Sequence, residues 1–335
     1  MAQLVKLQDY ISRYQIDLAR YPTQFVRLKK NQWDRVKRQW EAGDEIEQWE
    51  HIEPATLVEE EEVDKSRFSF LKKLLPTRAT NDSMAEDGVA ESIDVSNEPD
   101  EDYIPEEEST LHFEPNIVYN PKTLDELKRM FMDQFFHFQM KWASSTVREK
   151  SYVDPKYMRD SFLRTCLQSL PDCYLLFYYP ILQIKKAPIE LEIILLTPTE
   201  CIIIKLLEED DQAVYIGSSD RFWVKKVGKI EKKTLSPIID LNRSEAILSQ
   251  LFQQEGVEVP IRKVILSRNG YIDYPGTAYG IQIVDRRKFS EWMQGIKKSV
   301  SPMKHMQIRA AQSMLKTCQT TSFQRDIWHV ETSAE

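Results

Sequence analysis

The stretch 189–205 carries two short apolar runs, Ile193–Leu196 and 202–204, on either side of a polar turn at 197–200. Runs this short, rich in β-branched residues and bounded by turn residues, predict strands that are buried on both faces rather than a helix. We therefore expect the chain to fold around a β-hairpin that lies in the middle of a sheet.

Charged residues stand at the open end of this hairpin. Glu190 and Glu192 precede the first strand, and Lys205 closes the second. Side chains of the same parity share one face of a sheet, so a carboxylate and a lysine placed in this way can converge. Metal-dependent nucleases use an acid before one strand and a lysine after its partner. The pattern therefore raises the question of whether this chain performs such chemistry.

The chain of 335 residues has a formal net charge of -8, and its acidic residues are concentrated in one segment. From Glu59 to Glu114 there are 18 acidic and 5 basic residues, so the rest of the chain from 115 on is mildly basic. A segment this poor in apolar residues cannot bury enough surface to offset its ordering entropy. We predict a disordered acidic linker at 51–116, which is also a candidate for contact with a protein partner.

We predict four regions: an N-terminal helical segment at 1–50, the acidic linker, an α/β domain with its preceding helices at 117–300, and a polar tail at 301–335. No apolar run is long enough to span a membrane, and no signal peptide is recognisable. The four cysteines show no metal-binding spacing and are typical of buried thiols in a reducing compartment. These features predict a cytoplasmic protein.

The N-terminal segment reads as two helices, broken at Tyr21 and Pro22, because apolar residues recur at three- and four-residue steps over 4–42. Basic residues interleave with its aromatic residues. Such a surface can bind single-stranded nucleic acid by backbone attraction and base stacking. The alternative is an amphipathic hairpin with a solvated basic face. The candidate nucleic-acid-binding residues are Lys29, Lys30, Arg35, Lys37 and Arg38.

The elements after the linker predict a mixed α/β order. Helices are expected at 121–143, where Thr123 and Glu126 form a capping box, and at 154–170. Strands are expected at 173–179, 192–196, 201–206, 213–216, 222–225, 230–234, 261–266 and 280–284. Further helices are expected at 237–254 and 287–297, and the chain should end in a loose helix and tail. The fold class is α/β, a mixed sheet flanked by helices.

Residues about 150 to 297 resemble the NERD (nuclease-related) domain, a member of the restriction-endonuclease-like PD-(D/E)xK superfamily. Glu192-Ile-Ile-Leu-Leu-Thr-Pro stands at the family's Asp-containing strand, and Cys201-Ile-Ile-Ile-Lys205 stands at its Glu-x-Lys strand. The opening residues 4–10 and 20–22 also look like the N-terminus of NERD-type proteins of Bacillus-like bacteria. The resemblance implies a restriction-endonuclease-like sheet and a metal-dependent phosphodiesterase site.

Carried over by position, that site consists of Glu192 as metal ligand, Lys205, and Asp160 as the helix acid. The glutamate of Glu-x-Lys falls at Ile203, which cannot bind a metal. The Asn-Pro-x-x-Gln of the family is replaced by Ser236-Pro-Ile-Ile-Asp240. Glu208 or Glu209 could replace the lost acid, or could lie in an exposed acidic turn.

Two hypotheses follow. The first is a catalytically inactive NERD-type scaffold that binds nucleic acid or protein and requires no cofactor. The second is a nuclease with a rearranged site that uses Mg²⁺ or Mn²⁺, with Asp160, Glu192 and Lys205 at its centre and Glu190 in reserve.

Overall fold

The structure is a computed structural model that describes residues 1–43, 113, 121–146, 151–185, 187–208, 210–275, 280–298 and 301–321. All of these residues belong to one compact unit. The predicted acidic linker at 51–116 lies outside the described residues except for Phe113. That residue is buried, and its ring packs against Phe131, Phe135 and Phe138 with centroid separations of 5.8, 5.0 and 5.1 Å.

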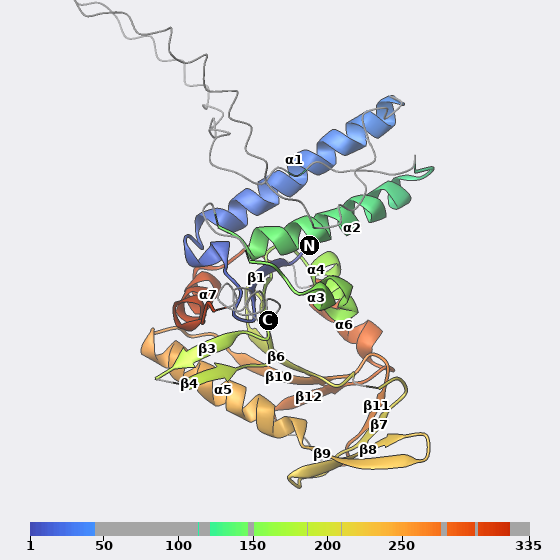
Figure 1. Cartoon of the computed structure of the whole chain (residues 1–335), viewed down its shortest axis with the longest axis vertical. Coiled ribbons are helices and arrows are strands. Elements are labelled where there is room, and N and C mark those ends of the chain that lie inside the picture. Colours follow the sequence, from blue (N-terminus) through green and yellow to red (C-terminus); the bar gives the residue numbers. More distant parts are fainter. Residues whose placement is uncertain are drawn as a thin grey trace, which may run out of the picture. The chain divides into compact units, whose positions relative to one another are not determined.

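A six-stranded mixed sheet forms the centre of the unit, with strand order β1-β2-β5-β6-β10-β12 (Figure 1). Its strands are β1 (Gln3–Leu7), β2 (Leu175–Tyr178), β5 (Ile193–Leu196), β6 (Cys201–Leu206), β10 (Ile261–Leu266) and β12 (Ile281–Val284). The predicted hairpin is confirmed: β5 and β6 are antiparallel and occupy the two middle positions. Every residue of β5 is buried, as its unbroken apolar run predicts.

Two smaller sheets complete the β-structure. A four-stranded sheet has the order β11-β7-β8-β9, with β7 (Val214–Ile216), β8 (Phe222–Val227), β9 (Ile230–Leu235) and β11 (Tyr271–Asp273). Strands β3 (Ile181–Ile184) and β4 (Ala187–Glu190) pair as a hairpin. The sequence patterns did not predict β3, β4 or β11, because these strands are short and partly exposed.

Helix α5 (Pro237–Gln254) covers one face of the six-stranded sheet over β6 and β10. Lys205 of β6 and Lys263 of β10 both form ion pairs with α5, so the odd-numbered residues of these two strands face this helix. Ile202 and Arg262 have the opposite parity and line a cavity under α6 (Phe289–Lys298). The sheet therefore has α5 on one face and α6 on the other (Figure 1).

The structure of the N-terminal region differs from the sequence-based expectation. The prediction of a first helix between residue 4 and the break at Tyr21 is wrong. Gln3–Leu7 form β1 at the edge of the central sheet, parallel to β2, and a short 3-10 turn, η1 (Arg13–Gln15), follows. The whole of β1 is buried, including Gln3 and Lys6. Pairing with β2 and burial have overridden the helical spacing of its apolar residues.

The second N-terminal helix is confirmed as α1 (Arg20–Ala42), which includes Pro22 in its first turn, where proline is tolerated. It lies side by side with α2 (Leu124–Ala143) and runs antiparallel to it (Figure 1). Trp40 donates a hydrogen bond of 2.8 Å to the Pro121 carbonyl at one end, and Tyr21 packs on Trp142 at the other. Helix α1 is therefore joined to α2 at both ends, and α2 in turn packs on β1 of the central sheet.

The predicted helix at 154–170 is two helices, α3 (Pro155–Arg159) and α4 (Ser161–Ser169), which meet at Asp160. The predicted loose terminal helix is α7 (His305–Thr317), and it is firmly packed: Ala310, Ala311 and Met314 are fully buried. Gln307 of this helix donates hydrogen bonds to the carbonyls of Cys173 and Leu196, at 2.6 and 2.9 Å. Helix α7 thus ties the ends of β2 and β5 together.

None of the helices in the described ranges is long and apolar enough to cross a membrane.

Candidate functional site

Lys205, at the end of β6, lies between two carboxylates. Its Nζ atom is 2.8 Å from Oε1 of Glu192 and 2.8 Å from Oδ2 of Asp240. The β5–β6 register pairs Ile193 with Ile204, which places Glu192 beside Lys205 at the open end of the hairpin. Asp240 belongs to the first turn of α5. The hairpin and the helix that covers it therefore build one charged cluster.

Burial sets the electrostatics of this cluster. Glu192 is only 6% exposed, and burial raises the pKa of its carboxyl group even though Lys205 is adjacent. Burial alone would lower the pKa of Lys205, but the attraction of Glu192 and Asp240 outweighs it, so the pKa of the ammonium is raised. Arg243 approaches the other oxygen of Asp240 at 3.6 Å. Lys205 is thus firmly protonated and shared between two acids.

Ile203 stands where the resemblance places a second metal-binding carboxylate. It is fully buried, has the same parity as Lys205, and pairs with Ile194 of β5 and Lys263 of β10. A hard divalent cation needs several oxygen ligands. Here Glu192 and Asp240 are both occupied by one ammonium, and the neighbouring position is apolar. The donor set does not fit Mg²⁺ or Mn²⁺, and the described residues contain no group of three or more potential metal ligands.

Asp160 forms hydrogen bonds that stabilise the start of α4 and the side chain of Tyr178. Its Oδ1 accepts hydrogen bonds from the backbone amides of Phe162 and Leu163 at 2.9 Å, so it caps α4. Its Oδ2 accepts a hydrogen bond of 2.5 Å from the Tyr178 hydroxyl, and burial together with this carboxylate raises the pKa of the phenol. The structure therefore does not bring Asp160 into the Lys205 cluster.

A separate open pocket of 440 Å³ contains Asp160 together with Glu190, the acid held in reserve by the sequence argument. Tyr179 also lines it, with a left-handed backbone (φ 47°), and the acids around that tyrosine include both Asp160 and Glu192. Three of the acids considered from the sequence, Asp160, Glu190 and Glu192, thus lie around one tyrosine, but in two groups rather than one.

Glu208 is held by Arg268. The guanidinium donates to both carboxylate oxygens, with Nε–Oε1 and Nη2–Oε2 distances of 2.6 Å. The side chains are 13% and 19% exposed, so this is a half-buried bidentate pair and not an exposed acidic turn. Its oxygens are therefore occupied and do not replace the missing acid. Glu209 lies outside the described residues.

The candidate nucleic-acid-binding residues of α1 fall into two sets. Lys29 forms an ion pair with Asp172 at 3.0 Å, Lys37 pairs with Glu41 at 3.5 Å, and Arg38 donates to the Asp34 carbonyl at 3.1 Å. Lys30, Arg35 and Arg38 are exposed. The helix therefore presents part of its basic face to solvent and uses the rest for contacts within the protein.

The residue that the sequence argument missed is Asp240. The signal was present, because Asp240 stands at the glutamine position of the motif that the resemblance supplies. In the sequence alone, Asp240 is a departure from that motif, and no local spacing indicates that its side chain is directed at Lys205. Only the packing of α5 on β6 shows that the two residues meet.

Comparisons with known proteins add little. No family model matches the chain, and no solved structure matches it. A segment of 42 residues is 55% identical to part of an RNA 2',3'-cyclic phosphodiesterase from Geobacillus stearothermophilus. The match covers 12% of this chain and 13% of that protein, which is too short a segment to assign a fold or an activity.

Proposed function

We propose that this chain is a nuclease-related protein that does not hydrolyse phosphodiesters and that serves in the cytoplasm as a nucleic-acid-binding scaffold. The observation that carries the proposal is the state of the Lys205 cluster. The lysine is bonded to Glu192 and Asp240, and the adjacent buried position is Ile203.

The order of elements supports the nuclease-related part of the proposal. Helix α4 precedes β2, the β5–β6 hairpin carries Glu192 and Lys205, and α5 and then β10 follow, while β1 is an additional N-terminal strand of the sheet. This is the order that the NERD resemblance implies. The retained scaffold without a metal-ligand set favours binding over turnover, since phosphodiester hydrolysis in this superfamily depends on carboxylates that hold the ion.

The exposed part of the basic face of α1 supports nucleic acid as the ligand. Lys30 and Arg35 lie on it, and the chain from 115 on is mildly basic although the whole protein is acidic. Sequence-independent attraction to phosphates requires such a local positive surface rather than a positive total charge. A protein partner of the acidic linker is a further proposal, and that linker lies outside the described residues.

One observation favours the alternative, a metal-dependent nuclease with a rearranged site. Asp240 brings a second carboxylate to Lys205, which the sequence did not predict. If a substrate phosphate drew the ammonium away, Glu192 and Asp240 would become available as a pair of acids.

The two functions are separated by incubating the purified full chain with single- and double-stranded DNA and RNA in the presence of Mg²⁺ or Mn²⁺. We expect retarded bands in a gel-shift assay, no cleavage products, and no stoichiometric heat in a calorimetric titration with Mn²⁺. Turnover by the wild type that disappears in both Lys205→Ala and Glu192→Ala overturns the proposal and establishes the nuclease.

A further inference from the structure

A cavity of 590 Å³ lies where three helices and the segment between α4 and β2 meet. Helix α1 contributes Lys30 and Trp33, α2 contributes Lys128 and Phe131, and α6 contributes Lys297. The volume falls in the range of sites that hold small ligands or parts of larger ones. The Lys205 cluster does not line it, so the cavity is separate from the candidate site described above.

The floor of this cavity is apolar and aromatic. Trp33 is half-buried and packs edge-on against Phe131, with ring centroids 5.3 Å apart. Val26, Met132 and Leu170 also line it. A half-exposed indole that packs edge-on against a buried phenyl ring offers an aromatic surface on which another ring can stack.

The rim of the cavity is cationic. Lys30, Lys128 and Lys297 are exposed, come from three different helices, and form no ion pair with any residue in the part of the chain that the structure describes. Lys29 and Asp172 also line the cavity, but they neutralise each other at 3.0 Å. The rim therefore carries three uncompensated positive charges spread around one opening.

This distribution of charge selects among ligands. A fatty acid or another simple amphiphile has one anionic group and would match one lysine. A ligand with one flat ring for the floor and several separate charges for the rim matches the whole site. Nucleic acid has that character, and only in a single strand are the faces of a base free to enter, because in a duplex they stack on their neighbours.

We propose that this cavity binds a single strand of DNA or RNA, with one base against Trp33 and neighbouring phosphates on Lys30, Lys128 and Lys297. The proposal rests on the nucleic-acid binding proposed above and gives it a location and a strand preference. It assigns the main contact to the junction of α1, α2 and α6 rather than to Arg35, Lys37 and Arg38 farther along α1.

The test is a fluorescence-anisotropy titration of the full chain with labelled single strands of about 12 nucleotides and with the matching duplex, over a range of salt concentrations. The variant Lys30→Gln/Lys128→Gln/Lys297→Gln should bind single strands at least tenfold more weakly. Its salt dependence should be shallower by about 2 in the log–log slope, since each phosphate contact on a single strand contributes about 0.7.

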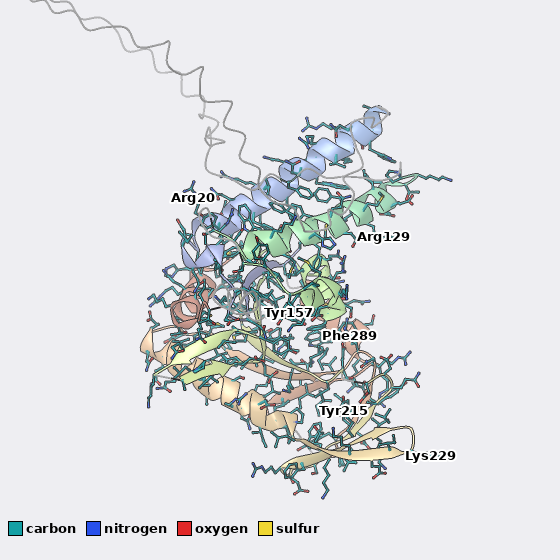
Figure 2. All side chains as sticks on the ribbon, in the orientation of Figure 1. Arg20, Arg129, Tyr157, Tyr215, Lys229 and Phe289 are labelled. Atoms are coloured by element: carbon teal, nitrogen blue, oxygen red, sulfur yellow. The ribbon has the colours of Figure 1, made fainter. Side chains whose placement is uncertain are left out.

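A matched control carries the same change of charge at another place. Lys229, Lys232 and Lys233 are exposed on the β8–β9 hairpin, and Figure 2 shows Lys229 at its tip, away from α1 and α2. Their triple change to Gln should leave the affinity within about twofold. Trp33→Leu should weaken binding about tenfold, and Trp33→Phe should retain most of it, because a phenyl ring can still stack on a base whereas an aliphatic side chain cannot.

The outcomes distinguish the two proposals. If neither single strands nor duplexes bind, the proposed function itself fails. If single strands bind and the rim-lysine and Trp33→Leu variants bind them as tightly as the wild type, only the cavity proposal is overturned. Equal affinity for the duplex also overturns it. So does tighter binding of poly-glutamate than of single strands at equal charge concentration, since that result favours an acidic protein as the ligand.

Discussion

The Nζ atom of Lys205 lies 2.8 Å from the Oδ2 atom of Asp240, and this ion pair joins the end of a central strand to the first turn of the helix that covers it. The same ammonium reaches Glu192 on the neighbouring strand. Because one cation compensates two partly buried acids, the cluster depends on the lysine more than on either carboxylate.

Replacing Lys205 by Met should therefore lower the free energy of unfolding by about 2–3 kcal/mol, less than for a fully buried pair because the lysine is about a quarter exposed. Urea unfolding followed by circular dichroism measures the change. Adding Glu192→Gln and Asp240→Asn to Lys205→Met should recover part of the loss, because both uncompensated charges are then removed. A single variant as stable as the wild type contradicts the structural role of the cluster.

Ile203→Glu should not rebuild a metal site. The side chain is fully buried between β5 and β10, so an added carboxylate has no water and faces α5. We expect a loss of at least about 3 kcal/mol in the free energy of unfolding, and no gain of manganese-dependent stability. Ile203→Val is the control and should cost about 1 kcal/mol. A large rise in melting temperature of Ile203→Glu with Mn²⁺ would show that the scaffold still forms an ion site.

Asp160 should act as a helix cap. Asp160→Ala removes the acceptor for two backbone amides and for the Tyr178 hydroxyl, and should cost about 1–3 kcal/mol of stability. Asp160→Asn retains a carbonyl oxygen that can cap α4 and should cost clearly less. Chemical denaturation of both variants measures this order. Equal losses in Asp160→Ala and Asp160→Asn would show that the negative charge, rather than the acceptor geometry, is what matters.

The local patterns predicted the centre of the fold well. The limits of β6, α5 and β10 agree with the expected ranges 201–206, 237–254 and 261–266. Each of these segments has one strong signal: a short apolar run, 202–204 in β6 and 264–266 in β10, and a proline at the first turn of a long helix. Where one local signal dominates, the secondary structure that the sequence favours is also the one that tertiary packing requires.

The same reasoning failed where burial depends on distant partners. Gln3–Leu7 have helical spacing, yet they form an edge strand because β2 offers a place for them in the sheet. The Lys205 cluster is similar: the hairpin pair of Glu192 and Lys205 followed from parity, but Asp240 joins them only through packing. Contacts between elements far apart in the chain are set by the whole fold and leave no local spacing to detect.

Lys6 gives the last prediction, which concerns pH. It is fully buried on β1, and its Nζ atom donates to the Tyr10 carbonyl at 2.5 Å and to Gln15 Oε1 and Thr320 Oγ1, both at 3.2 Å. Burial lowers the pKa of this ammonium to about 8, while Cys318 and Asp9 act in the opposite direction. An unfolded lysine titrates near 10.5, so between pH 8 and 10.5 the unfolded chain binds more protons than the folded one.

This difference in proton binding makes the contribution of Lys6 to stability depend on pH. The penalty for the buried charge is present in full below pH 8 and is relieved as the pH rises toward 10.5, so the contribution of Lys6 to stability increases with pH. Lys6→Met has no such group. The free energy of unfolding of the wild type relative to Lys6→Met should rise by on the order of 2 kcal/mol between pH 7 and 10. Urea unfolding at a series of pH values measures the difference, in which groups that do not interact with Lys6 cancel. Cys318 does interact with Lys6, so the comparison is made in a Cys318→Ala background. Parallel curves for the two proteins would mean that water or a counter-ion reaches Lys6 and that its pKa is not lowered.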